Sequence, residues 1–254
     1  PLYNVNYYLK HMKDAAPYVD DATMKHYEGV GRFWRAWFYW DKVKTFGDVP
    51  WYDEPIDPDD DEQLYKGRDP RDYVMQKVLE DLDFAATWCS KASKYVNTNV
   101  INRYVALALK SRICLYEGTY RKYHNLNLDG HDANFYLDLA AKAALEIIEK
   151  GPYKLYQTGH PEKDYLTLFA QKDASPEEYI LAIKFDYAIG ARHNASAYTL
   201  LPTQGRPGLT RKFINTYLMD NGTAFTDKPG WQEMQFIEET DGRDPRLAQS
   251  IRTP

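Results

Sequence analysis

The sequence predicts a mainly α-helical protein with irregular loops and little β structure. Three observations carry this prediction: long segments with apolar residues at helical spacing, polar Pro-containing stretches between them, and a single short run with strand composition. The chain has 254 residues, of which 44% are apolar and 27% charged, enough to bury a sizeable core. The net charge of −5 is spread along the chain and argues against a nucleic-acid partner.

The first long helix is predicted over residues 28–46. Its apolar positions recur at helical spacing, and several aromatic residues widen the stripe almost all round: Val30, Phe33, Trp34, Trp37, Phe38, Trp40 and Val43. Such a helix is expected to be covered on several sides. Gly47, with Pro50 shortly after it, is a stop signal.

Three further helices follow the acidic stretch Asp53 to Pro70, which is predicted to be a solvated loop. Asp69 as N-cap and Pro70 in the first turn predict a helix that runs to about Cys89. The spacing of apolar residues predicts two more helices, over residues 98–117 and 134–150.

These last two helices form a pair that is similar to a tetratricopeptide repeat. Tyr116 to Tyr120 resembles the turn of that repeat, and Ala140 and Ala144 are the small residues that let two helices pack closely. The polar stretch Arg121 to Ala133 lengthens the connection between them. The pattern favours a helical-repeat scaffold.

After Gly151 the sequence changes character. Glu178 to Tyr187 is rich enough in β-branched and aromatic residues to predict a short strand. An irregular segment over residues 188–209, a short helix from Thr210 to Leu218 and a last helix that starts at Asp244 complete the expected elements.

The usual catalytic and metal-binding motifs are missing from the sequence. The six His are scattered, and no hydrolase elbow, dinucleotide loop or phosphate-binding Gly-Lys-Ser/Thr motif is present. Cys89 and Cys114 fit no metal motif and are expected to be small buried side chains on helices. A carboxylate pair such as Asp129 and Asp132 is too generic among 37 acidic residues to indicate catalysis. From these motifs the sequence assigns no catalytic residue, no metal ligand and no cofactor.

Aromatic residues make up 15% of the chain, and 22 of them are Tyr. Tyr and Trp can fill a core or present a ring to a ligand, and a pyranose packs its apolar face on such rings while polar side chains bond its hydroxyls. A loop that mixes both kinds of residue follows Asp186. The candidate ligand contacts are Tyr198, Trp231, Arg192, His193, Asn194 and Arg206. The alternative interpretation is a surface loop with local hydrogen bonds.

Four segments, read in order, resemble the SusD/RagB family of outer-membrane nutrient-binding lipoproteins from Bacteroidetes. They are Gly31 to Asp41 followed by Phe46-Gly47-Asp48-Val49-Pro50, then Ala106 to Tyr120, Leu218 to Gly222, and Gly242 to Leu247 with its Arg-Asp-Pro-Arg-Leu sequence. The resemblance implies a SusD-like α/α superhelix of tetratricopeptide-like pairs. It also implies that residues 1–254 are a single SusD-like domain, a fragment without the lipidated N-terminus and the C-terminal part.

The resemblance implies a function as well. A SusD-like protein is anchored by an N-terminal lipid on the extracellular face of the cell outer membrane. There it binds oligosaccharides or polysaccharides without catalysis and delivers them to a SusC-like TonB-dependent transporter. Peptide capture of the RagB type, an all-α glycoside hydrolase and a scaffold that binds only protein are the alternatives.

Overall fold

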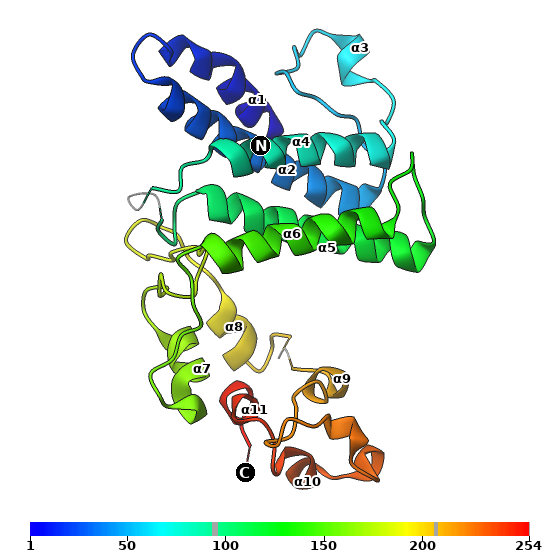
Figure 1. Ribbon diagram of the computed structural model, residues 1–254, viewed down its shortest axis with the longest axis vertical. Coiled ribbons are helices and arrows are strands. Elements are labelled where there is room, and N and C mark those ends of the chain that lie inside the picture. The colour runs from blue at the N-terminus through cyan, green and yellow to red at the C-terminus, as the bar shows by residue number, and fades with distance from the viewer. Residues whose placement is uncertain (93–95, 206–207, 254) are drawn as a thin grey trace. The chain divides into compact units, whose positions relative to one another are not determined.

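The computed structural model describes residues 1–92, 96–205 and 208–253, which fall into two compact units, residues 1–153 and 154–254 (Figure 1). The predicted helical fold with little β structure is confirmed: within the described residues, β pairing is limited to isolated bridges. That residues 1–254 form one SusD-like domain of a longer protein stays a prediction.

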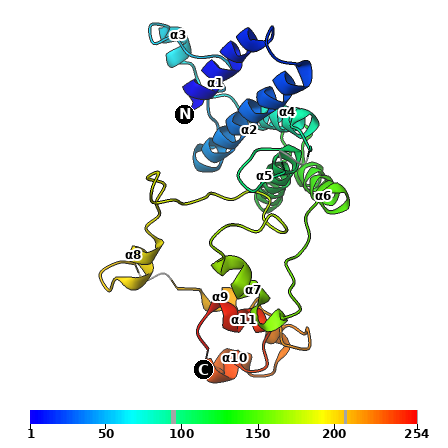
Figure 2. The same ribbon diagram turned by 90° about the vertical axis from the view of Figure 1, so that its left-hand side faces the viewer.

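Unit 1 is a stack of helices in which successive partners run antiparallel. Its helices are α1 (Leu2–His11), the 3-10 turn η1 (Met12–Ala15), α2 (Asp21–Phe46), α3 (Asp61–Leu64), α4 (Arg71–Trp88), α5 (Arg103–His124) and α6 (Ala133–Lys150). α2 packs on α4, α4 on α5 and α5 on α6, and α5 and α6 lie side by side in both views (Figure 1, Figure 2). This order of antiparallel neighbours is that of a helical-repeat scaffold.

The long aromatic helix is confirmed and begins earlier than predicted. Asp20 caps α2, because its Oδ1 accepts the amide of Thr23 at 2.8 Å. Gly47 ends the helix with φ 73°, a conformation that glycine adopts without strain. The helix is covered on several sides, as expected, since α2 contacts α1, α4 and α5 and buries Phe33 and Trp40, while Trp34 is 46% exposed.

Substituting Gly47 tests the helix stop. Gly47→Ala is expected to lower the free energy of unfolding by about 1 kcal/mol or more, because an L side chain is strained at this φ. Gly67→Ala is the matched control, since Gly67 lies in the same unit, has open space around it and has no positive φ. Urea denaturation compares the two. An equal loss in both variants would contradict this account.

The start of α4 differs from the prediction. Asp69 does not cap the helix, because its Oδ2 accepts the amide of Trp51 at 2.6 Å. The amide of Arg71 donates instead to Asp48 Oδ1 at 2.8 Å. Asp48, from the Phe-Gly-Asp-Val-Pro segment, therefore joins the end of α2 to the start of α4. The exposed acidic stretch before α4 contains the short helix α3, which the sequence did not predict.

α5 runs through the segment that resembles a repeat turn. Asn102 caps it by accepting the amides of Tyr104 and Val105, and the helix ends only at Asn125, which has φ 51°. The predicted end at residue 117 is thus wrong. Gly118 lies inside the helix, where a Cβ would stand 2.8 Å from Cγ of Leu137. Glycine at this position allows α6 to approach α5 closely. It does not form a turn.

α6 matches its predicted range, and small side chains pack it on α5. Ala140 is buried as predicted, whereas Ala143 rather than Ala144 is the second buried small residue. Ser111 Oγ donates to the Ala140 carbonyl at 3.0 Å. Cys89 and Cys114 are buried free thiols, as predicted, and burial raises the pKa of each to about 12.

Unit 2 consists of short helices joined by long irregular segments. They are α7 (Pro161–Ala170), α8 (Ala195–Leu200), α9 (Arg211–Ile214), η3 (Phe225–Asp227), η4 (Trp231–Glu233), α10 (Phe236–Thr240) and α11 (Pro245–Ser250). α7 packs on α11, and Asp244 caps α11 by accepting the amide of Arg246 at 2.9 Å, as predicted.

Three predictions in unit 2 are wrong. The segment over residues 188–209 is not irregular throughout, because Ala195–Leu200 form the helix α8. Residues 178–187 are irregular and contain one isolated bridge from Asp186 to Ala191, because no segment among the described residues pairs with them as a strand. The helix expected from Thr210 to Leu218 is limited to α9, since the chain turns after Asn215, and Leu218 then forms a bridge with Ala224 and Met219 with Arg243. Within the described part of the chain, no helix is long and apolar enough to span a membrane.

Candidate functional site

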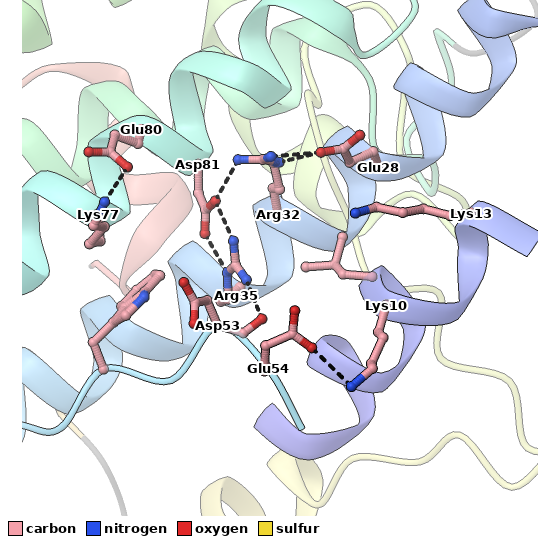
Figure 3. Close-up of a pocket in the computed structure, with 12 residues that line it drawn as sticks. Lys10, Lys13, Glu28, Arg32, Arg35, Asp53, Glu54, Lys77, Glu80 and Asp81 are labelled. Carbon is pink, nitrogen blue, oxygen red and sulfur yellow. Dashed lines mark hydrogen bonds and ion pairs between the residues drawn. The ribbon is translucent and has the colours of Figure 1, made fainter. Parts of the chain in front are cut away.

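A cavity of about 280 Å³ opens in unit 1 among α1, η1, α2, α4 and the loop at residues 51–54, and we call it the charged cavity (Figure 3). Its lining is mainly polar. The basic members are Lys10, Lys13, Arg32, Arg35 and Lys77, and the acidic members are Glu28, Asp53, Glu54, Glu80 and Asp81, with Leu9 and Trp51 beside them. Five positive and five negative side chains thus line the cavity without a net charge.

The floor of the charged cavity is a buried ion pair between α2 and α4. Arg35 donates to both carboxylate oxygens of Asp81, from Nε at 2.7 Å and from Nη2 at 2.8 Å. Arg32 reaches the same carboxylate from the other side at 3.4 Å, as Figure 3 shows. Burial alone would lower the pKa of Arg35, but the hydrogen bonds and charge of Asp81 outweigh it and raise this pKa. Asp81 is therefore held in place by charge-assisted hydrogen bonds to both of its carboxylate oxygens.

Backbone and ring contacts fix this floor further. Arg35 Nη1 donates to the Asp53 carbonyl at 3.3 Å, and its guanidinium lies 5.2 Å from the ring centre of Trp51. Asn6 of α1 donates to the carbonyls of Tyr52 and Glu54, which attaches the loop at residues 51–54 to the first helix. The floor is thus preorganised before any ligand arrives.

The rim of the charged cavity is more exposed. Arg32 pairs with Glu28 at 2.7 Å, Lys77 with Glu80 at 2.8 Å and Lys10 with Glu54 at 3.4 Å. These side chains can donate to or accept from hydroxyl groups without a change of net charge. Carboxylates and guanidiniums on a fixed floor suit an uncharged, hydroxyl-rich ligand.

A second buried ionic cluster joins α4 to α5 and lies outside the charged cavity. Glu117 accepts from Arg71 Nη2 at 2.6 Å and from Arg121 Nε at 2.8 Å, and Arg121 Nη2 also donates to Asp72 at 2.8 Å. His131 approaches Asp72 at 3.2 Å. Because these groups satisfy one another in the core, their role is to hold the helices in register. Among the described residues, no group of three His, Cys, Asp or Glu could hold a metal ion.

The structure places the loop residues predicted as ligand contacts on the surface of unit 2. Arg192, His193, Asn194 and Tyr198 are exposed, and Trp231 is half-buried in η4. Arg192 lies 3.9 Å over the ring of Tyr187 and His193 packs edge-on to Phe185, so both are held within their own loop. Arg206 lies outside the described residues. None of these described side chains lines the charged cavity.

Sequence reasoning did not find the residues of the charged cavity. Arg35 stands between the fully buried Phe33 and Ala36, and Asp81 lies between Leu79 and Leu82. A basic residue on one apolar helix face and an acidic residue on another predict a buried pair once the two helices are known to pack. The sequence alone does not say which helices meet.

Comparison with known proteins gives the fold a name. The search against protein-family models found no match, and neither did the search of curated proteins. Among solved structures, a SusD-like protein from Bacteroides fragilis matches 98% of this chain and 46% of its own, with TM-score 0.66 and 21% identity. A SusD-like carbohydrate binding protein from the same organism matches 96% of this chain and 44% of its own, with TM-score 0.65 and 16% identity.

A third structure, described as a complex with xylogluco-oligosaccharide, matches 73% of this chain and 33% of its own, with TM-score 0.53 and 18% identity. The chain therefore has the SusD-like fold, a helical-repeat architecture, as the resemblance predicted. It spans less than half the length of each of these three structures.

Proposed function

We propose that this chain is a non-catalytic carbohydrate-binding protein of the SusD/RagB type. The observation that carries the proposal is the SusD-like fold over 98% of the chain. A protein with this fold is described as carbohydrate binding, and another was solved with xylogluco-oligosaccharide.

The charged cavity supports this proposal because it suits hydroxyl groups. Ionised carboxylates accept hydrogen bonds from sugar hydroxyls, and guanidiniums donate to their oxygens. At about 280 Å³ the cavity has room for one sugar residue, near the lower limit of roughly 300 Å³ for ligand pockets. Both carboxylate oxygens of Asp81 already accept from Arg35, an arrangement that suits a fixed hydrogen-bonding floor rather than the proton-donating carboxyl group that a glycosidase needs. This favours binding over hydrolysis.

The location and partner belong to the same proposal. The chain would be part of a lipoprotein on the extracellular face of the outer membrane that delivers its ligand to a SusC-like TonB-dependent transporter. The ordered motifs at Gly31 to Pro50 and Gly242 to Leu247 support this, together with the Bacteroides source of the matching structures.

Trp231 and Tyr198 are proposed ring contacts for the ligand, with Arg192, His193, Asn194 and Arg206 as polar contacts. Trp231→Ala and Tyr198→Ala are each expected to weaken glycan binding by about 1–3 kcal/mol, the size of losses when a stacked ring is removed. Trp231 is expected to matter more, because Arg211 holds its carbonyl at 3.2 Å and fixes the turn that carries the ring. Titration calorimetry measures both.

Tyr18→Ala is the control for these two variants, since Tyr18 is 86% exposed and lies in unit 1. If Trp231→Ala and Tyr198→Ala both bind glycan as tightly as the unmodified protein, these two residues are not part of the binding site.

A panel of immobilised oligosaccharides and peptides tests the function itself. Saturable binding to at least one glycan without new reducing ends is the expected result. Binding to peptides alone would favour capture of the RagB type, and sustained release of reducing ends would show a glycoside hydrolase. If the protein associates with a transporter but binds neither glycan nor peptide, it is a protein-binding scaffold.

A further inference from the structure

We infer that a cleft in unit 2, lined by aromatic side chains, stacks against the apolar face of an uncharged sugar ring. This aromatic cleft has a volume of about 370 Å³ and is lined by Tyr165, Phe213, Thr216, Tyr217, Leu218 and Arg246. It lies entirely within unit 2 and contains none of the loop residues proposed above. The inference rests on the proposed function and adds to it a binding site with a stated ligand class.

The rings of the aromatic cleft are open to solvent. Tyr165 is 37% exposed and Phe213 48% exposed, and the rings of Phe213 and Tyr217 stand 5.9 Å apart at 89°. Leu218 adds a further apolar side chain that is 41% exposed. Three aromatic residues from α7, α9 and the turn after α9 thus line one concave surface. A flat ring with apolar C–H groups on its face covers such a surface and releases the water on it.

The walls of the cleft are held by contacts behind it. Arg243, which is buried, donates from Nη2 to the carbonyls of Ile214 at 2.9 Å and Tyr217 at 2.8 Å. Gln249 of α11 accepts the amide of Leu166 at 2.8 Å and so fixes α7 beside α11. Because the rings are carried by fixed backbone, a ligand loses little affinity to ordering of the protein.

The polar edge of the cleft indicates an uncharged ligand. Asp244 binds Arg246 side on, with Nε at 2.9 Å from Oδ1, and these hydrogen bonds lower the pKa of the Asp244 carboxyl. The carboxylate therefore cancels the charge of the guanidinium while leaving Nη1 without a hydrogen-bond partner among the described residues. Nη1 and the hydroxyl of Tyr165 can bond to ring hydroxyls. An anionic sugar gains no net attraction here.

Titration calorimetry on the whole chain tests this site with cello-, malto- and xylogluco-oligosaccharides as neutral probes and oligogalacturonate as the charged one. Tyr165→Ala and Phe213→Ala are each expected to weaken binding of a neutral probe about ten-fold. Tyr165→Phe keeps the ring and is expected to stay within about three-fold. Tyr123→Ala is the control, because Tyr123 is 83% exposed and lines none of the cavities described above.

The outcomes separate this inference from the proposed function. If a neutral probe binds the unmodified protein and both alanine variants equally, the cleft is not a sugar site, while glycan binding stands. If the charged probe binds tighter and its affinity falls with salt, the assignment to uncharged sugars is wrong. If peptides bind and Tyr165→Ala abolishes that binding, the occupant is a peptide and the inference fails. If no probe binds at all, the proposed function fails and the inference falls with it.

Discussion

Replacement of Arg35 by alanine is expected to lower the free energy of unfolding by about 3–5 kcal/mol, because it leaves Asp81 buried with its main counter-charge removed. Asp81 is 2% exposed, and its remaining partner, Arg32, reaches it at 3.4 Å. The Asp81 carboxylate then loses both hydrogen bonds from Arg35 and is left with the longer contact to Arg32. The same change removes the floor of the charged cavity.

Urea denaturation followed by tryptophan fluorescence measures this effect, because five of the six Trp lie in unit 1. The double variant Arg35→Ala with Asp81→Ala removes both charges. Its loss of unfolding free energy is expected to be smaller than the sum of the losses in the two single variants. Lys42→Ala, which removes an exposed pair with Asp41, is expected to change stability by less than about 0.5 kcal/mol. If Arg35→Ala lowers the free energy of unfolding by less than about 1 kcal/mol, the pair does not stabilise the protein as expected.

Replacement of Glu117 by alanine is expected to lower the free energy of unfolding at least as much as Arg35→Ala does, by about 3–5 kcal/mol. Glu117 is fully buried and accepts from two guanidiniums, Arg71 at 2.6 Å and Arg121 at 2.8 Å. Without it, two cations remain between α4 and α5. Among the described residues, Arg121 keeps a carboxylate partner, Asp72, whereas Arg71 keeps none. Charge repulsion and loss of hydrogen bonds act in the same direction here.

The same denaturation experiment checks Glu117 with two comparisons. Glu117→Gln keeps the shape and one acceptor oxygen, so it is expected to lose less than the alanine variant. Asp138→Ala removes the exposed partner of Lys142 on α6 and is expected to leave stability almost unchanged. Equal stability of Glu117→Ala and Asp138→Ala would contradict the structural role given to the cluster.

Local signals in the sequence predicted the elements that local chemistry determines. Gly47 ends α2 and Asp244 starts α11, because a positive φ and a side-chain cap depend on neighbouring residues alone. The strand predicted at residues 178–187 failed for the opposite reason. Strand composition needs a partner segment to become a strand, and the described residues supply only isolated bridges.

The site was harder to predict than the fold. The charged cavity brings together Lys10, Arg35, Asp53 and Asp81 from four separate segments. The spacing of these residues in the sequence does not predict that they lie close together. Ring chemistry favoured Tyr198 and Trp231, which the sequence placed in predicted loops and the structure places in α8 and η4. It did not indicate Tyr165 or Phe213, because helical spacing gives exposed and packed rings the same pattern.

Titration of the whole chain with neutral oligosaccharides, continued long enough to detect turnover, tests the central claim most directly. The account predicts saturable binding in the micromolar to millimolar range, about −8 to −4 kcal/mol, followed by a stable baseline with no new reducing ends. Absence of saturable heat with every glycan, or sustained release of reducing ends, would contradict a non-catalytic carbohydrate-binding function.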